Sequence, residues 1–172
     1  MRSPKPLKNS SLAKSKVLSQ QKAAAAARRL KRQGRKIVFT NGTFDILHLG
    51  HVQYLQKARA CGDALIVGVN TDESVKSYKD PGRPVNPEKD RALVLSALAC
   101  VDYVVLFNEP TPLNLIKKIR PNVLAKGADW KKSQIAGAQE VESWGGKVRL
   151  ISLVSGRSTT NVIEKILRLG KS

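Results

Sequence analysis

The sequence predicts an α/β fold in which five parallel strands lie between two layers of helices. Short apolar runs rich in β-branched residues alternate along the chain with longer amphipathic segments, which is typical of βα repeats that build one parallel sheet. The run over residues 64–69 is apolar without interruption, as expected of a strand covered on both faces. We therefore expect a Rossmann-like, doubly wound, three-layer α/β/α sheet.

The chain opens with a segment that does not fit this pattern. Residues 1–16 are rich in Ser, Pro and Lys and hold too little apolar surface to pack, so we expect a disordered basic arm there. A single domain is then expected over residues 17–172. It begins with a helix over 20–32, because Ser19 is a typical N-cap, the alanine run favours helix, and Gly34 follows the end.

Capping and turn residues set the remaining boundaries. Glycine and proline punctuate the predicted helices, as at Gly62, Pro87, Pro121 and Gly170, and serine begins two of them. In order, the predicted strands are 37–40, 64–69, 102–107, 122–125 and 148–152. The predicted helices after the first are 51–60, 71–79, 87–99, 112–119, 133–144 and 158–169.

Charge and composition limit the classes of protein to consider. The formal net charge is +18, but residues 1–35 hold 11 Lys and Arg and no acidic residue, whereas residues 36–172 hold 20 basic and 13 acidic residues, a net of +7. The body is thus moderately basic, which suits anionic small molecules. No apolar run approaches the ~20 residues of a membrane span, and no secretory signal is visible. Cys61 and Cys100 are expected to be buried thiols, and we expect a soluble cytosolic protein.

Both histidines of the chain lie in one short segment. His48 and His51 belong to T-N-G-T-F-D-I-L-H-L-G-H over residues 40–51, between a predicted strand and a predicted helix. A strand, a turn of small residues and a helix present backbone N–H groups to a phosphate in open α/β sheets. A metal-binding pair and a plain surface role are the alternatives, although the spacing is not that of H-E-x-x-H. Neither a dinucleotide fingerprint nor a P-loop is present.

Three further segments follow predicted strands or begin predicted helices, so they are expected to meet the histidines at one edge of the sheet. The first is K-G-A-D-W over residues 126–130, and the second is G-R-S-T-T-N over 156–161. The third is R-P-V-N-P over 83–87, with Asp90 and Arg91 behind it. Each has a simpler reading as a turn, a helix cap or a surface ion pair.

Taken together, these motifs resemble those of the HIGH-motif, cytidylyltransferase-like nucleotidyltransferase superfamily. Within it, T-N-G-x-F-D-I-L-H-x-G-H, R-P-V-N-P, K-G-A-D-W and S-T-T-N-V-I-x-K-I are similar to the heptose 1-phosphate adenylyltransferases. The resemblance covers residues 19–170, and without a sugar-kinase half the chain resembles the stand-alone form. Thr43 and Arg157 depart from the residues common at their positions.

The resemblance implies adenylyl transfer from ATP to D-glycero-D-manno-heptose 1-phosphate. The products are ADP-heptose, for lipopolysaccharide core biosynthesis, and pyrophosphate. Mg²⁺ would accompany ATP without being held by protein ligands alone, and a cytoplasmic homodimer without membrane or nucleic-acid partners is implied. Because a phosphomonoester has a second pKa near ~6, the acceptor is largely a dianion at neutral pH and needs no general base. The histidines would instead donate hydrogen bonds to charged oxygens.

The same resemblance assigns roles to residues. The catalytic residues would be His48, His51 and Lys126, with Lys126 also holding the β- and γ-phosphates. The nucleotide-binding residues would be Thr40, Asn41, Gly42, Thr43, Phe44, Gly50, Arg91, Gly127, Ser158, Thr159 and Thr160. Candidates for contact with the sugar phosphate are Asp45, Arg83, Asp129 and Trp130.

Three other functions stay open from the sequence. A sister enzyme such as a glycerol-3-phosphate cytidylyltransferase would share the histidine and S-T-T motifs. A fragment of a class I aminoacyl-tRNA synthetase would share H-x-G-H, but no K-M-S-K-S string exists. A non-enzymatic nucleic-acid-binding protein would depend on the basic arm, and its affinity would fall steeply with salt.

Overall fold

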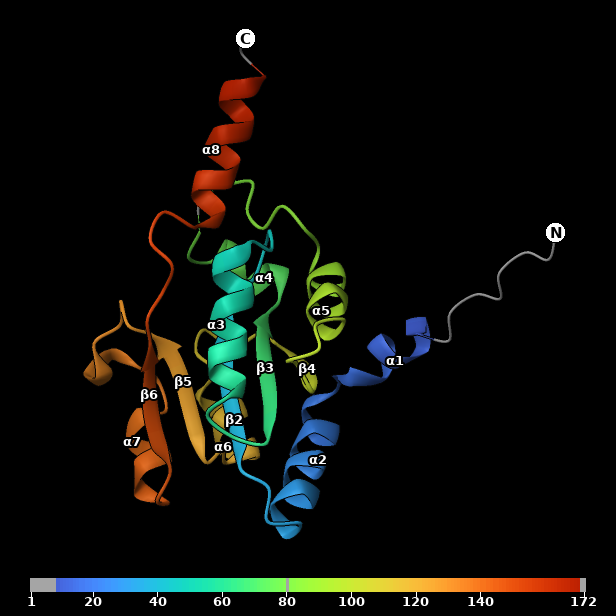
Figure 1. The fold of residues 1–172 in the computed structure, drawn as a ribbon, viewed down its shortest axis with the longest axis vertical. Coiled ribbons are helices and arrows are strands. Elements are labelled where there is room, and N and C mark those ends of the chain that lie inside the picture. The colour runs from blue at the N-terminus through green and yellow to red at the C-terminus, as the bar shows by residue number, and fades with distance from the viewer. Residues whose placement is uncertain (1–8, 80, 171–172) are drawn as a thin grey trace, which may run out of the picture.

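The computed structural model describes residues 9–79 and 81–170, and within these a single sheet of parallel strands forms the centre of the molecule (Figure 1). The strand order is β1-β4-β3-β2-β5-β6. Their bounds are Val17–Leu18 for β1, Ile37–Gly42 for β2, Ala64–Asn70 for β3, Tyr103–Phe107 for β4, Val123–Gly127 for β5 and Lys147–Ile151 for β6. The five predicted strands are confirmed, and the two-residue β1 adds a sixth.

Helices cover both faces of the sheet, which confirms the predicted three layers. On one face, α2, α6 and α7 enclose a core around Phe39 and Ile116, and on the other, α3 and α5 pack Leu55 and Leu95 against Leu65. The helices are α1 (Asn9–Lys16), α2 (Gln20–Arg32), α3 (Leu49–Arg59), α4 (Asp72–Lys76), α5 (Glu88–Ser96), α6 (Leu113–Ile119), the 3₁₀ turn η1 (Lys132–Gln134), α7 (Ala138–Ser143) and α8 (Thr159–Leu169). Over the described ranges, no helix combines the length and apolar character needed to cross a membrane.

Half of the segment predicted to be a disordered arm, residues 9–16, lies within the described part of the chain. Residues 1–8 lie outside the described part of the chain, but residues 9–16 form α1. Lys16 Nζ donates a 2.8 Å hydrogen bond to the carbonyl oxygen of Val101, and β1 pairs with β4. These interactions satisfy main-chain hydrogen-bonding groups of β1 and of the turn after α5. The sequence of the segment does not reveal them, because the partners lie far away along the chain. The division of the chain at residue 16 stays a prediction.

Two local predictions are wrong. The helix expected over 133–144 is divided into η1 and α7, because Gly137 takes a φ of 85° and a Cβ there would lie 2.7 Å from Ile116 Cδ1. A glycine in this conformation lets the chain approach α6 closely but interrupts the helix. Cys61 and Cys100, expected to be buried, are both partly exposed.

The strand order places a switch point beside β2. The chain proceeds from β2 through β3 to β4 on one side, and β5 and β6 lie on the other. Connections therefore diverge at the carboxyl ends of β2 and β5, which is where open α/β sheets bind their ligands. The ends of these two strands carry Asn41–Gly42 and Lys126–Gly127.

Candidate active site

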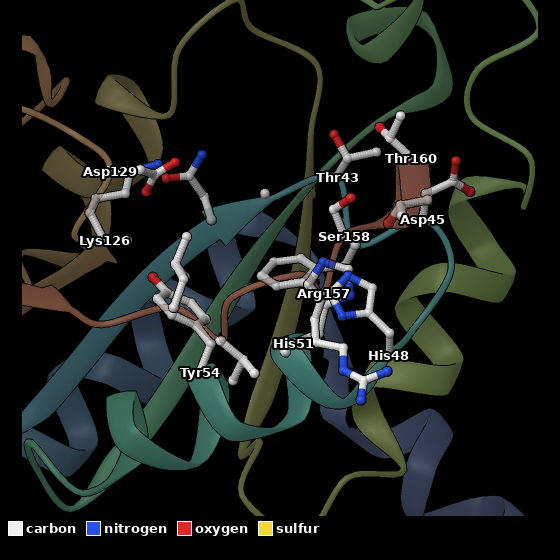
Figure 2. A pocket seen from close by; sticks show the side chains of 18 of the residues that line it. Thr43, Asp45, His48, His51, Tyr54, Lys126, Asp129, Arg157, Ser158 and Thr160 are labelled. Carbon is white, nitrogen blue, oxygen red and sulfur yellow. The ribbon is translucent and has the colours of Figure 1, made fainter. Parts of the chain in front are cut away.

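A cavity of about 400 Å³ opens at this switch point, and we call it the histidine cavity (Figure 2). Sixteen of the residues predicted for the site line this cavity: Asn41, Gly42, Thr43, Phe44, Asp45, His48, Gly50, His51, Arg83, Lys126, Gly127, Asp129, Trp130, Ser158, Thr159 and Thr160. The sequence had not singled out four others, which are Tyr54, Lys79, Leu153 and Val154, and it had noted Arg157 only as a departure from the family pattern.

The two histidines stack on each other at the start of α3. Their ring centroids are 3.9 Å apart with an interplanar angle of 25°, and the Phe44 ring meets His51 edge-on at 5.3 Å. Gly50 permits this arrangement, since a Cβ there would lie 2.9 Å from His48 Cε1. Among the described residues, neither imidazole Nδ1 has a hydrogen-bond partner although both atoms are buried. Buried polar atoms without a partner are rare, so these nitrogens point to a bound ligand.

Both imidazoles are held in the neutral form. Burial, reinforced by His48, lowers the pKa of His51 from 6.5 to about 4, against the opposing effects of a hydrogen bond with Ile46 and the charge of Asp45. Burial and the positive charge of Arg157 also lower the pKa of His48. A neutral imidazole offers one N–H donor, and an anion bound beside it would favour the protonated form.

The depressed pKa of His51 predicts that the free protein loses stability in mild acid. Stability is fully present above pH 6.5, the ordinary value, and is lost as the pH falls toward the folded value of about 4. At ~1.4 kcal/mol per pKa unit, we expect a loss of about 2 kcal/mol at pH 5. Urea unfolding of wild type and His51→Gln at pH 7.5 and pH 5 measures it, because the variant lacks this dependence. Equal pH dependence in both proteins would contradict the burial of a neutral His51.

A lysine and an indole face the histidines across the cavity. Lys126 is the penultimate residue of β5, and Figure 2 shows it beside Asp129, on the other side of the cavity from His48 and His51. Its ammonium lies 5.2 Å from the centre of the Trp130 ring. Burial lowers the pKa of Lys126 to about 8, partly opposed by the charge of Asp129. The site therefore holds a poorly solvated cation that an anionic ligand would stabilise.

The N-terminus of α8 forms the third side. Ser158 caps the helix by accepting a 3.1 Å hydrogen bond from the backbone N–H of Asn161. Thr159 Oγ1 donates to the carbonyl oxygen of Ile46 at 3.4 Å, which ties α8 to the segment before the histidines. Backbone N–H groups and the positive end of the helix dipole are thus presented to the cavity, an arrangement that favours phosphate.

Two predicted nucleotide contacts lie outside the histidine cavity. Thr40 is fully buried, and its hydroxyl shares a 2.7 Å hydrogen bond with Tyr54. Arg91 has no exposed side-chain surface and donates to the carbonyls of Thr43, Asn70 and Asn86 and to the Asp72 carboxylate. Their polar groups already have protein partners, and their direct contact with a nucleotide stays a prediction.

Asp45 and Arg83 line the cavity and form an ion pair with each other. The Asp45 carboxylate accepts hydrogen bonds from Arg83 Nε and from the backbone N–H groups of Val85 and Asn86. These bonds hold the pKa of Asp45 below its ordinary value even though burial alone would raise it. The carboxylate is therefore ionised and engaged, and it holds the R-P-V-N-P loop against the histidine segment.

A second cavity of about 450 Å³ adjoins the first, and we call it the Gln134 cavity. The two share Asn41–Thr43, Lys79, Lys126 and Trp130. The second cavity adds groups from the loops after β3 and β4 and from η1, which are Asn70, Tyr78, Pro110, Thr111, Pro112, Gln134, Ile135 and Ala136. The described lining contains two lysines and no carboxylate, so it favours an anionic ligand that also carries hydrogen-bonding groups.

Position in the folded chain explains the residues that the sequence analysis missed. Tyr54 lies three residues after His51, so helical spacing alone could have placed it on the same face. Lys79, Leu153 and Val154 lie in connecting segments with no distinguishing pattern. Gln134 lines the second cavity from η1, which is a separate element from α7 because Gly137 interrupts the predicted helix.

A family model described as cytidylyltransferase-like matches residues 39–165. The chain belongs to the cytidylyltransferase-like family. It is similar to the bifunctional protein HldE of Syntrophotalea carbinolica, with 56% identity over 137 residues, 80% of this chain and 28% of the relative. HldE of Methylobacillus flagellatus is 54% identical over 151 residues, 88% of this chain and 31% of the relative. The chain thus spans less than a third of the length of these relatives.

Solved structures of the fold agree with this membership. A lipopolysaccharide core biosynthesis protein from Thermoplasma volcanium matches with a TM-score of 0.58 and 27% identity, covering 70% of this chain and 98% of that one. A pantoate–β-alanine ligase from Francisella tularensis matches with a TM-score of 0.57 and 19% identity, over 88% and 78% of the two chains. The second likeness concerns the fold alone.

Proposed function

We propose that this member of the cytidylyltransferase-like family transfers the adenylyl group of ATP to D-glycero-D-manno-heptose 1-phosphate. The products are ADP-heptose, for the lipopolysaccharide core, and pyrophosphate. The observation that carries the proposal is the meeting of two neutral histidines with buried Nδ1 atoms, the start of α8 and Lys126 around one cavity at the switch point. Each is a donor suited to phosphate oxygens. The relation to the HldE proteins supports the choice of nucleotide and sugar.

The histidine cavity is where we place ATP. The triphosphate would lie between His48, His51 and the α8 N-terminus, with Arg157 as a further cation. Leu153 and Val154 supply apolar surface for the nucleoside, and Asp129 supplies an acceptor for its hydroxyls.

The Gln134 cavity is where we place the sugar phosphate. Its lysines, Lys79 and Lys126, suit the phosphate, and the amide and hydroxyl groups of the lining suit a polyol. Trp130 is 46% exposed, which leaves indole surface for the C–H face of a sugar ring. Lys126 belongs to both cavities, so we propose that it lies between the attacking phosphate and the phosphates of ATP. This differs from a role on the β- and γ-phosphates alone.

The proposed reaction needs orientation and charge stabilisation rather than a base. A phosphate oxygen of the acceptor attacks the α-phosphorus, the bond to the β,γ-pyrophosphate breaks, and no proton has to be removed from a largely dianionic nucleophile. The histidines and Lys126 would donate to the oxygens that gain charge. Holding both anions at one point of the sheet reduces the entropic part of the barrier.

A divalent metal is typical of this family. We propose Mg²⁺ bound chiefly to phosphate oxygens and water, because this ion retains several waters and is often held by few protein carboxylates. Within the described residues, no three His, Cys, Asp or Glu side chains gather as a metal-binding group. The ion would neutralise charge on the triphosphate, while the residues named above bind and orient the two substrates.

We also propose a cytoplasmic homodimer, without a nucleic-acid or membrane partner. The support for a dimer is α8, whose residues Ile166, Leu167 and Leu169 are each more than half exposed. Figure 1 shows this helix extending beyond the sheet layers, and an apolar stripe so placed is suited to a second copy of the chain. Sedimentation at micromolar concentration distinguishes dimer from monomer.

A pyrophosphate-release assay tests the function. We expect pyrophosphate to be released faster from ATP with heptose 1-phosphate than from ATP, CTP, GTP or UTP with mannose 1-phosphate or glycerol 3-phosphate. The reason is that a site built to bind particular hydroxyl groups rejects analogues that lack them by large factors. If CTP with glycerol 3-phosphate gave the highest rate, the proposed substrates would be wrong and the proposed mechanism would still stand. No release with any pair in the presence of Mg²⁺ would contradict the enzyme assignment.

A further inference from the structure

The loop that carries the histidines contains a residue in an unfavourable backbone conformation. Phe44 has a φ of 48°, in the left-handed region that costs a non-glycine residue about 1–2 kcal/mol. Its ring is buried and lies edge-on to His51, which in turn stacks on His48. The backbone at Phe44 therefore sets where both imidazoles lie, and neighbouring contacts must maintain it.

Arg91 fixes the chain immediately before Phe44. Its guanidinium donates at 2.6 Å to the carbonyl oxygen of Thr43, at 2.9 Å to that of Asn70 and at 2.9 Å to that of Asn86. The Asp72 carboxylate accepts from it at 2.6 Å. One buried side chain thus joins the loop after β2 to the end of β3 and to the R-P-V-N-P loop.

Asp45 fixes the chain immediately after Phe44. Its carboxylate accepts from Arg83 Nε at 2.8 Å and from the backbone N–H groups of Val85 and Asn86 at 2.9 Å each. The Asn86 amide donates in return to the backbone carbonyl oxygen of Asp45 at 2.8 Å. Because Asn86 also accepts from Arg91, the two anchors close into one network around Phe44.

We propose that Arg91 and Asp45 are positioning residues that hold Phe44 in its left-handed conformation and thereby set the stacked geometry of His51 and His48. Neither is a catalytic residue, because their polar groups are engaged within the protein. The Arg91 side chain has no exposed surface, and that of Asp45 is 1% exposed. The inference goes beyond the proposed function and does not depend on the identity of the substrates.

Histidine NMR tests the proposal without any ligand. The chain has two histidines, so their ring resonances are readily assigned by substitution. In wild type we expect His51 to titrate near pH 4. In Arg91→Lys, which keeps the charge but cannot reach all four acceptors, we expect the His51 midpoint to move toward 6.5 as the ring leaves its buried place beside Phe44.

Asp45→Asn separates two explanations, because loss of the carboxylate charge and loss of the hydrogen-bond network shift the pKa of His51 in opposite directions. The Asp45 charge itself raises the pKa of His51, so loss of that charge alone would lower the midpoint. Loss of the network instead raises it, and we expect a rise. Phe44→Leu should raise the midpoint as well, and adding Asp45→Asn to Phe44→Leu should produce no further rise if both act through Phe44. Lys89→Ala, an exposed cation on α5, is the matched control and should leave the titration unchanged.

Enzyme kinetics supply a second readout. With the substrates proposed above, Arg91→Lys should lower kcat by about 10-fold to 100-fold through misplaced histidines, with a smaller change in the KM for ATP. If Arg91→Lys does not fold, Asp72→Asn takes its place, because it removes the carboxylate partner of the guanidinium.

Two results would overturn the proposal. One is a set of folded variants with lower stability but wild-type histidine titrations, and the other is a His51 midpoint that falls or does not change in Asp45→Asn. Failure of the substrate assignment would leave the titration result intact.

Discussion

Replacing His51 or His48 with Ala is expected to lower kcat by roughly 10²–10³, the measured range for loss of one donor to a charged transition state. Both imidazoles line the histidine cavity with a buried Nδ1 that lacks a partner in the described residues, so a phosphate oxygen is the group they are placed to meet. Steady-state pyrophosphate release under saturating substrates measures the effect.

Each histidine variant needs proof that the fold survives. Circular dichroism and urea unfolding at pH 7.5 provide it, and Lys89→Ala serves as a surface control outside both cavities. Near-normal kcat in both folded variants would remove the histidines from the mechanism. Unfolding of both would instead indicate that the stacked rings chiefly support the loop.

Changing Lys126 to Met is expected to lower kcat/KM by about two orders of magnitude, again by removing a donor to a charged oxygen. Methionine keeps the length and the apolar stem but has no charge, so the contact with Trp130 is largely retained. Lys131→Met is the matched control, because Lys131 is exposed in the loop that follows β5 and lines neither cavity. A similar loss in both variants would show that general charge around the site, rather than Lys126 itself, matters.

The same lysine predicts the alkaline side of the pH profile. With a pKa of about 8 in the free protein, Lys126 loses its proton as the pH rises through 8, and kcat/KM should fall there. The acidic side should follow the acceptor phosphate, with a pKa near ~6. Lys126→Met should remove the alkaline fall and leave the acidic limb in place. An alkaline limb that persists in this variant would assign it to another group.

Much of the fold follows from local patterns. The five principal strands are short apolar runs, and the caps Ser19 and Ser158 are visible in the sequence because a hydroxyl before a helix satisfies a free N–H. The errors lie where distant residues decide. Gly137 interrupts a predicted helix through its close approach to Ile116, and α1 with β1 depends on partners in the turn after α5 and in β4.

The site divides in the same way. His48, His51, Lys126 and Ser158 were predictable, because they follow strands or open helices and parallel strands end at one edge of a sheet. The burial of Arg91 was not predictable, since a basic residue on a helix suits a ligand contact and a surface charge equally well. Its direction and its burial depend on contacts with Thr43 and Asn70, which are far away in sequence.

The sequence by itself determined which chemical groups this protein brings to its site and the order of strands and helices that carries them, because motif spacing and side-chain periodicity are local properties of the chain. Only the tertiary structure decided what state those groups are in. Burial makes His51 neutral and Lys126 a weaker base, and the hydrogen bonds of Arg91 and Asp45 join them to separate loops. Desolvation and hydrogen-bond saturation depend on everything packed around a group, so they appear only when the chain has folded.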